Sequence, residues 1–285
     1  MSEIQSVGVL GSGQMGSGIV QVAAVSGFDV ILRSRNMASA EGCKAMLEKS
    51  LTKLVGKGRI EEAAASKALD RVRVTAAMHD LADCDLVLES VVEDLAIKKE
   101  FFNELDSVCK KGAILATNTS TLSVTEIAMA TGRPDHVVGV HFFNPAPVMA
   151  LVEIVEALTT DPDVTARATA FAGSCGKNPV QVKDRAGFIV NALLFPYLNG
   201  AVRHLELGIA NRDDIDAAMK DGCGFPMGPL ALLDLVGLDT SLAILEALHA
   251  EYGDSSMLAQ PLLKRMVAAG DFGRKSGKGF YDYSR

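Results

Sequence analysis

The first 185 residues alternate short apolar runs with longer amphipathic segments. The apolar runs are mostly continuous and rich in β-branched residues, which is typical of strands buried on both faces of a sheet. Helix-length segments between them favour a mostly parallel sheet with right-handed crossovers. The predicted strands are Ser6–Leu10, Asp29–Arg33, Val72–Thr75, Leu86–Ser90, Ile114–Thr117, Val137–His141, Leu151–Val155 and Val180–Val182. The predicted helices of this half include Gly16–Ser26, Ala38–Leu54, Ala96–Val108 and Thr165–Cys175.

Strand patterns stop near Ala186, and helical patterns follow. Asn211 is followed by Asp213 and Asp214, which places acceptor side chains and negative charge where a helix exposes free N–H groups. The sequence therefore predicts an α/β protein with two domains: an N-terminal Rossmann-like, mostly parallel sheet domain over residues 1–185, and an all-helical domain over residues 186–285. The predicted helices of the second domain are Asn191–Leu207, Arg212–Lys220, Leu230–Glu251 and Met257–Ala269.

Composition narrows the class of protein. The chain has 285 residues, 48% hydrophobic and 22% charged, which is enough apolar surface for packed cores. A net charge of −7 argues against a nucleic-acid partner. Five cysteines lack the spacing of a metal site, so we expect reduced thiols and no metal. The uncharged stretch Ile4–Phe28 contains too many glycines for a membrane helix, and no basic leader precedes it, so we expect a cytoplasmic protein without a membrane partner.

The first strand runs directly into a G-x-G-x-x-G motif and an apolar helix. Gly11 permits a tight turn, Gly13 lets the backbone approach a pyrophosphate, and Gly16 lets the helix pack closely on the strand. The motif alone is weak evidence, but here it opens an N-terminal βαβ unit, which is its confirming context. We therefore expect a dinucleotide held by Gly11, Ser12, Gly13, Gln14, Met15 and Gly16.

The end of the second strand decides which dinucleotide is preferred. An NAD-binding Rossmann domain usually has an acidic residue here, about 20 residues after the glycines, to accept from the ribose hydroxyls. This chain has Ser34 and Arg35 instead. A hydroxyl and a guanidinium suit a 2′-phosphate, which a carboxylate would repel. The expected cofactor is therefore NADP, with NAD as the weaker alternative; the other reading of Arg35 is a solvated surface arginine.

Three polar segments follow or end predicted strands, where the ligands of open α/β sheets gather. They are Asn118-Thr119-Ser120, His141-Phe142-Phe143-Asn144-Pro145 and Leu151-Val152-Glu153. His141 and Glu153 could form a plain ion pair. They are also the residue types of a general base, in which a carboxylate holds an imidazole in one tautomer.

With these motifs the sequence resembles the 3-hydroxyacyl-CoA dehydrogenase family, and in particular its bacterial 3-hydroxybutyryl-CoA dehydrogenases. The resemblance covers nearly the whole chain, and the order of its motifs is highly specific. The motifs are Gly11-Ser12-Gly13-Gln14-Met15-Gly16-Ser17-Gly18, Asn118-Thr119-Ser120, His141-Phe142-Phe143-Asn144-Pro145-Ala146-Pro147-Val148-Met149, Gly187-Phe188-Ile189-Val190-Asn191, Pro226-Met227-Gly228-Pro229 and Gly273-Arg274-Lys275-Ser276-Gly277-Lys278-Gly279-Phe280-Tyr281.

The resemblance implies a role for each matching residue. His141 would be the catalytic base and Glu153 its orienting partner, while Ser120 and Asn191 would bind the substrate around C3 and C1. The implied cofactor contacts are Glu93, Lys98, Ser120, Asn144 and Lys275. Ser34 stands where the family usually has aspartate, which is the chain's main departure from the pattern.

One face of the helix Ala38–Leu54 carries Ser50 and Lys53, and Lys57 follows just beyond it. The spacings of three and four place them on the same side. Composition alone favours a solvated lysine face. The family resemblance implies instead that these residues contact coenzyme A.

The resulting hypothesis is an oxidoreductase that interconverts acetoacetyl-CoA and (S)-3-hydroxybutyryl-CoA by hydride transfer with NADP(H), with His141 as the general acid–base. The resemblance also implies a homodimer or higher homo-oligomer assembled through the helical domain. Two alternatives stay open. One is an NAD-dependent 3-hydroxyacyl-CoA or hydroxy-acid dehydrogenase of the same fold, and the other is a non-catalytic nucleotide-binding protein.

Overall fold

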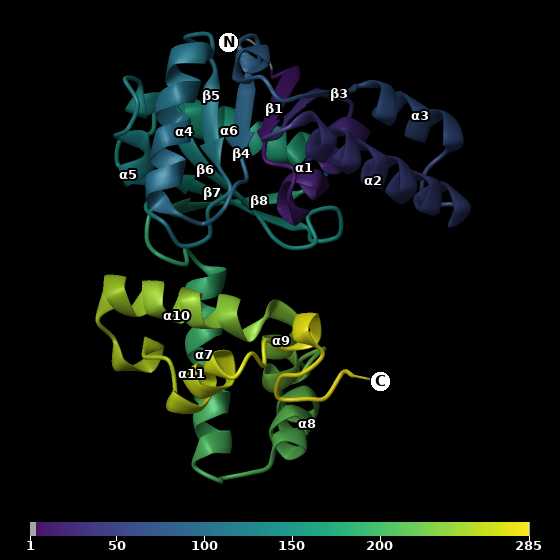
Figure 1. Cartoon of the computed structure of the whole chain (residues 1–285). Coiled ribbons are helices and arrows are strands. Elements are labelled where there is room, and N and C mark those ends of the chain that lie inside the picture. The colour runs from purple at the N-terminus through teal and green to yellow at the C-terminus, as the bar shows by residue number, and fades with distance from the viewer. Residues whose placement is uncertain (1–3, 285) are drawn as a thin grey trace. The chain divides into compact units, whose positions relative to one another are not determined.

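The computed structural model describes residues 4–284, which divide into two compact units with the boundary between Asp184 and Arg185 (Figure 1). Within the described residues of the first unit, eight strands form one sheet in the order β3-β2-β1-β4-β5-β6-β7-β8. Strands β3 to β6 run parallel, β7 runs antiparallel to β6, and β8 runs parallel to β7. This sheet confirms the predicted fold class. The strands are β1 Ser6–Leu10, β2 Asp29–Arg33, β3 Val72–Thr75, β4 Leu86–Glu89, β5 Ile114–Thr117, β6 Val137–Phe142, β7 Leu151–Glu156 and β8 Asn178–Lys183.

Helices lie on both faces of this sheet. α1 and α6 share one apolar cluster with alternate residues of the strands, and the Phe28 and Phe171 rings meet there at 5.1 Å. α4 and α5 lie on the opposite face (Figure 1). Two helices of this unit, α3 and α5, were not among those predicted. The helices are α1 Gln14–Val25, α2 Met37–Gly56, α3 Glu62–Asp70, α4 Leu95–Val108, α5 Val124–Ala128 and α6 Pro162–Ser174.

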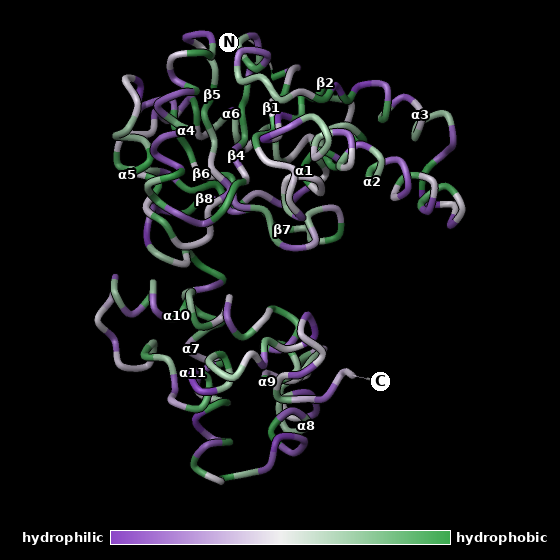
Figure 2. Tube along the Cα trace, in the orientation of Figure 1, coloured by the Kyte–Doolittle hydropathy of each residue, from purple (hydrophilic) through white to green (hydrophobic). Residues whose placement is uncertain are grey.

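The middle strands are buried along their whole length. Every residue of β4, β5 and β6 is buried, and Figure 2 shows hydrophobic residues concentrated along these strands. Three of these buried strand residues are polar: Glu89, Thr117 and His141 are each at most 6% exposed. All three lie at or beside the carboxyl ends of their strands. The sheet therefore concentrates buried polar groups at one of its edges.

The second unit is helical, with a core of its own. The single helix predicted over Leu230–Glu251 is wrong. Gly237 interrupts it with a φ of +103°, which the apolar pattern on either side does not reveal. The last predicted helix also starts later, at Pro261, after a 3₁₀ turn over Ser255–Met257. The helices are α7 Val190–Glu206, α8 Arg212–Cys223, α9 Pro229–Val236, α10 Leu238–Tyr252 and α11 Pro261–Ala268. None of the helices described for the chain combines the length and apolarity needed to cross a membrane.

A buried aspartate fastens the C-terminal segment onto these helices. Asp234 in α9 is 1% exposed and accepts hydrogen bonds from the backbone N–H groups of Phe280 and Tyr281, each at 2.8 Å. The Tyr283 hydroxyl donates to the same carboxylate at 3.1 Å. Three donors thus depend on one side chain.

We expect Asp234→Ala to lower the free energy of unfolding by about 3 kcal/mol or more, because buried N–H groups lose their acceptor. Urea unfolding measures the change. The exposed Asp221→Ala on α8 is the matched control and should stay within about 0.5 kcal/mol of the wild type. Equal effects of the two substitutions would contradict this role for Asp234.

Candidate active site

The loop between β1 and α1 has the shape of a pyrophosphate cradle. A Cβ on Gly11 would lie 2.3 Å from the Ser90 carbonyl oxygen, and one on Gly16 would lie 2.0 Å from the Gly11 oxygen, so both approaches require glycine. Gly13 is the N-cap of α1 and provides no side-chain cap, and the space around its Cβ position is open. The first N–H groups of α1 thus retain their capacity to bind an anion. These features fit a dinucleotide.

The cradle adjoins the end of β2. Ser34 is 3% exposed, and its hydroxyl lies 2.6 Å from that of Ser12. The next residue, Arg35, is exposed. Arg33 places its guanidinium 5.7 Å from the centre of the Phe101 ring, and its buried Nε has no hydrogen-bond partner among the described residues. This corner is therefore rich in donors.

The antiparallel register of β6 and β7 sets His141 directly opposite Glu153. The imidazole Nδ1 lies 2.8 Å from Glu153 Oε2, and both side chains are buried, with 8% and 0% exposed. The Phe143 ring packs against the imidazole at 4.5 Å. An ionised carboxylate at this distance would favour the tautomer with its proton on Nδ1 and would stabilise an imidazolium. The pair is therefore equipped for acid–base chemistry.

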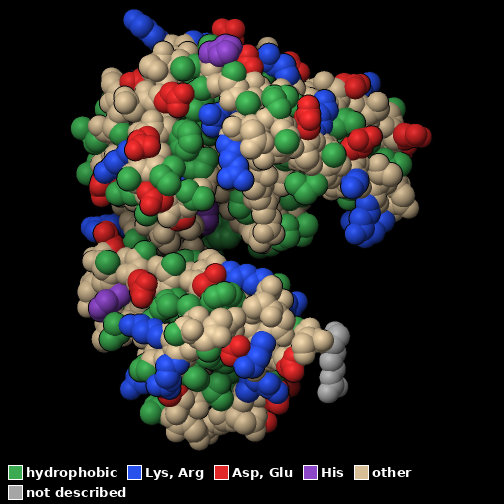
Figure 3. All heavy atoms as spheres, viewed as in Figure 1, with side chains coloured by type: hydrophobic (Ala, Val, Ile, Leu, Met, Phe, Trp, Pro, Cys, Tyr) green, Lys and Arg blue, Asp and Glu red, His purple; other side chains and the backbone are tan. Residues whose placement is uncertain are grey.

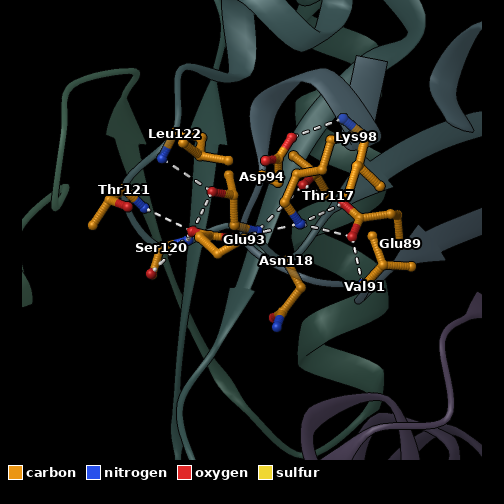
Figure 4. Close-up of polar contacts among 12 residues, drawn as sticks. Glu89, Val91, Glu93, Asp94, Lys98, Thr117, Asn118, Ser120, Thr121 and Leu122 are labelled. Atoms are coloured by element: carbon orange, nitrogen blue, oxygen red, sulfur yellow. Dashed lines mark hydrogen bonds and ion pairs between the residues drawn. The ribbon is translucent and has the colours of Figure 1, made fainter. Parts of the chain in front are cut away.

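A second polar network connects the loops after β4 and β5 (Figure 4). Glu93 Oε1 accepts hydrogen bonds from the Thr119 hydroxyl at 2.7 Å and from Ser120 N–H at 2.8 Å and its hydroxyl at 3.2 Å. Lys98 Nζ lies 3.4 Å from Glu93 Oε2. Burial by itself would raise the pKa of Glu93, but Lys98 and the bonds from Thr119 and Ser120 outweigh it and lower that pKa below its usual 4.5.

Further bonds tie the neighbouring loops together. The Asn118 side chain accepts from the Phe142 N–H at 2.8 Å, which joins the end of β5 to the end of β6. The Gln14 amide donates to Asn144 Oδ1 at 3.1 Å, which joins the glycine loop to the segment after His141. Several residues predicted to bind cofactor are thus in contact with one another: Ser12 with Ser34, Gln14 with Asn144, and Glu93 with Lys98 and Ser120.

The residues expected to contact coenzyme A lie on α2 or, for Lys57, directly after its last residue. The Ser50 hydroxyl donates to Gln21 of α1 at 2.8 Å, whereas Lys53 and Lys57 are exposed. A shallow depression beside them includes Lys49 and Lys53 in its lining. Figure 3 shows Lys and Arg side chains gathered over the end of the α2–α3 pair, although the chain as a whole is acidic.

Two predicted site residues belong to the second unit. Asn191 is 9% exposed and lies in the first turn of α7. Lys275 lies in a 3₁₀ turn over Arg274–Ser276, and its ammonium bonds to Asp239 Oδ2 at 2.7 Å. This turn belongs to the C-terminal segment that Asp234 fastens.

Both units match models of one family. Residues 6–185 match the 3-hydroxyacyl-CoA dehydrogenase NAD-binding domain, and residues 187–283 match the C-terminal domain of 3-hydroxyacyl-CoA dehydrogenase. The chain belongs to the 3-hydroxyacyl-CoA dehydrogenase family. Its Rossmann-type unit is accordingly that of an oxidoreductase with a nicotinamide dinucleotide cofactor.

Individual members of the family are similar over almost their full length. A 3-hydroxybutyryl-CoA dehydrogenase of Clostridioides difficile is 49% identical over 277 residues, 97% of this chain and 99% of that protein. The crystal structure of the (S)-3-hydroxybutyryl-CoA dehydrogenase PaaH1 from Ralstonia eutropha has a TM-score of 0.97 and 40% identity, covering 99% of this chain and 100% of that one. That of Mycobacterium tuberculosis FadB2 has a TM-score of 0.96 and 46% identity, covering 99% and 100%.

Sequence reasoning missed two buried residues that hold predicted site residues in place. Glu89 ends β4 and binds Lys98, and Thr117 ends β5 and donates to Glu89 at 2.8 Å. The available signal was an acid closing the apolar run Leu86-Val87-Leu88, since a buried carboxylate needs a partner.

The lowered pKa of Glu93 gives a prediction about acid stability. Because its pKa is lower in the folded chain than in the unfolded chain, ionised Glu93 stabilises the fold above pH 4.5, and this contribution is lost as pH falls through the folded-state pKa. We therefore expect the melting-temperature difference between the wild type and Glu93→Gln to shrink as pH falls from about 7 to about 3. The exposed Glu104→Gln on α4 is the control. A melting-temperature difference between wild type and Glu93→Gln that does not vary with pH would contradict a lowered pKa of Glu93.

Proposed function

We propose that this protein is a dehydrogenase that interconverts acetoacetyl-CoA and (S)-3-hydroxybutyryl-CoA, with NADP(H) preferred over NAD(H). The observation that carries the proposal is the buried His141–Glu153 pair, with Nδ1 and Oε2 2.8 Å apart. The segment that follows His141 contacts the dinucleotide cradle through the bond between Gln14 and Asn144. The names of the Clostridioides difficile and Ralstonia eutropha relatives support this substrate class. A binding protein without turnover has no evident need for such a pair.

His141 moves the proton in this proposal. In the oxidation direction its Nε2 accepts the proton of the C3 hydroxyl, and Glu153 stabilises the imidazolium that forms. The bound nicotinamide supplies the hydride acceptor for the hydrogen on C3. In reduction the imidazolium returns the proton to the oxygen on C3. The Ser120 hydroxyl, placed by Glu93, and Asn191 bind the substrate's oxygens.

Different groups of residues would contact different parts of the cofactor. We assign the pyrophosphate to residues 11–16, the adenosine ribose and its phosphate to Ser34 and Arg35, and the nicotinamide side to Glu93, Lys98, Ser120, Asn144 and Lys275. Contacts among Ser12 and Ser34, Gln14 and Asn144, and Glu93 and Ser120 support the assignments in the first unit.

Oligomer formation through the helical unit is also part of the proposal. Its support is the set of large apolar side chains that this unit exposes. They include Leu193, Leu207 and Ile209, at 72%, 63% and 62% exposure. A homodimer or higher homo-oligomer would cover such a surface.

We expect His141→Gln to lower kcat for acetoacetyl-CoA reduction by about two to four orders of magnitude, the usual scale for loss of a general acid–base. NADPH affinity, measured by fluorescence titration, should stay nearly unchanged because the imidazole serves the substrate oxygen. His79→Gln is the matched control, since the His79 side chain is 82% exposed. A His141→Gln variant that keeps more than about a tenth of the wild-type kcat would remove His141 from this role.

The cofactor preference gives a second expectation. The wild type should have a kcat/KM for NADPH at least about tenfold above that for NADH, because one charged contact to the 2′-phosphate accounts for such a factor. Ser34→Asp should reverse the order, since a carboxylate repels the phosphate and accepts from free ribose hydroxyls. Arg35→Ala should weaken NADPH use alone, and its NADH kinetics provide the internal control. Equal wild-type efficiency with both cofactors would refute the NADP preference.

Lys53→Ala and Lys57→Ala should raise KM for acetoacetyl-CoA by about five- to 150-fold while kcat changes less, because contacts to a remote part of the substrate are equally strong in ground and transition states. Lys67→Ala, on an exposed position of the neighbouring α3, is the control. Steady-state kinetics with a pantetheine thioester complete the test: both variants should match the wild type there. An equal KM increase with the truncated substrate would show that these lysines do not bind the nucleotide end.

A further inference from the structure

Glu89 is a carboxylate buried at the carboxyl end of a central strand. It closes β4, is 0% exposed, and each of its oxygens accepts two hydrogen bonds. Oε1 accepts from Val91 N–H at 2.6 Å and from Lys98 Nζ at 2.7 Å. Oε2 accepts from the Thr117 hydroxyl at 2.8 Å and from the same ammonium at 2.9 Å. The proposed mechanism assigns no role to Glu89.

The groups around Glu89 are all donors, so both of its side-chain oxygens must act as hydrogen-bond acceptors. An amide of the same shape offers one oxygen and one NH₂ group. In a glutamine at this position, the NH₂ group would therefore face the N–H or O–H donors that now bond to one carboxylate oxygen. The Thr117 hydroxyl can rotate to accept, but the Lys98 ammonium cannot. The carboxylate therefore fixes the direction of Lys98 as well as balancing its charge.

Lys98 passes this constraint on to the Ser120 loop. Its side chain is 1% exposed, and its ammonium also lies 3.4 Å from Glu93 Oε2. The other oxygen of Glu93 accepts from Ser120 N–H at 2.8 Å and from Thr121 N–H at 3.3 Å. As Figure 4 shows, these contacts form a continuous path from the end of β4 through α4 to the loop after β5.

We propose that Glu89 is a positioning residue that holds Lys98, and through Lys98 and Glu93 the Ser120 loop, in the geometry that cofactor and substrate require. The role of Ser120 itself rests on the proposed function. The hold on the loop does not, because it is a property of the unliganded chain.

The same strand offers a matched control at its opposite end. Asp85 directly precedes β4, and its carboxylate accepts from Gln5 N–H and Ser6 N–H, each at 2.9 Å, and from Lys110 at 2.7 Å. It is thus another carboxylate with several donors and one lysine partner. It lies at the amino end of the strand, away from the Ser120 loop. Asp85→Asn therefore reports the cost of weakening an ion pair of β4 without disturbing that loop.

The experiment compares Glu89→Gln with Asp85→Asn in the full-length protein. In Glu89→Gln we expect kcat to fall about 10- to 100-fold, as small displacements of reacting groups do, and the NADH Kd to rise about fivefold or more. Amide hydrogen exchange of Ser120 and Thr121 should accelerate. Asp85→Asn should lower the melting temperature and leave kcat, the NADH Kd and this local exchange unchanged.

A double-mutant cycle tests whether Glu89 acts through Lys98. In a Lys98→Met background, adding Glu89→Gln should change kcat by less than about twofold, because the path is already broken. Independent, multiplying effects would overturn the proposal. So would unchanged exchange at Ser120 and Thr121 in Glu89→Gln, or equal effects of Asp85→Asn on all three measurements.

A milder variant covers the case in which Glu89→Gln does not fold. Thr117→Val keeps every charge but removes the donor to Glu89 Oε2 and the acceptor of the Thr119 N–H at 3.2 Å. We therefore expect a smaller change in the same direction: about a two- to fivefold loss of kcat and faster exchange at Ser120. If both are unchanged, the proposal falls. If the wild type does not turn over acetoacetyl-CoA, the proposed function fails, while the exchange data still decide whether Glu89 holds the loop.

Discussion

Burial of the central strands on both faces is the constraint on which the site depends. A polar side chain in such a strand has no access to water, so it must find a partner within the protein. β4, β5 and β6 are buried throughout, yet they end in or contain Glu89, Thr117 and His141. Each of these meets a defined partner: Lys98, Glu89 and Glu153 respectively.

The same constraint fixes the positions of the side chains in the site. The His141–Glu153 pair is fixed by cross-strand register, and the Glu89–Lys98 pair is fixed by a strand end and the first turns of α4, which Asp94 caps at 3.0 Å. The loops that follow these strands are held by further hydrogen bonds. Glu93 accepts from the Ser120 N–H, and the Asn118 side chain accepts from the Phe142 N–H at the end of β6. The predicted site residues are thus held in place by buried residues beside them, and such fixed positioning is what preorganised catalysis requires.

Strong local patterns made most of the fold predictable. The bounds of β1, β2, β3 and β5 are those predicted. β1, β2 and β5 are short apolar runs bordered by polar residues or glycine, and β3 alternates apolar and polar residues. The pattern carries no strand direction, so it did not show that β7 runs antiparallel to β6. The loop between them, residues 143–150, is shorter than the dozen or so residues of a parallel crossover and contained that information.

Other features depend on tertiary contacts that periodicity does not encode. Gly237 lies between apolar helical turns, and its positive φ follows from packing rather than from its neighbours in sequence. Glu89 could be recognised as an acid closing an apolar strand, but its partner Lys98 lies nine residues away on α4, and only the fold brings the two together. The glycine motif, the Ser34–Arg35 corner and the His141–Glu153 pair were predicted from the residues themselves, and the other site residues through family resemblance. The buried residues that hold them were not predicted.

The most direct test of the account is the steady-state absorbance assay of reduced nicotinamide with the purified wild-type protein. We expect oxidation of the cofactor that depends on acetoacetyl-CoA, and the reverse reaction with (S)-3-hydroxybutyryl-CoA but not with its (R) enantiomer. Cofactor binding without turnover would contradict the account, and so would equal turnover of free acetoacetate and its CoA thioester.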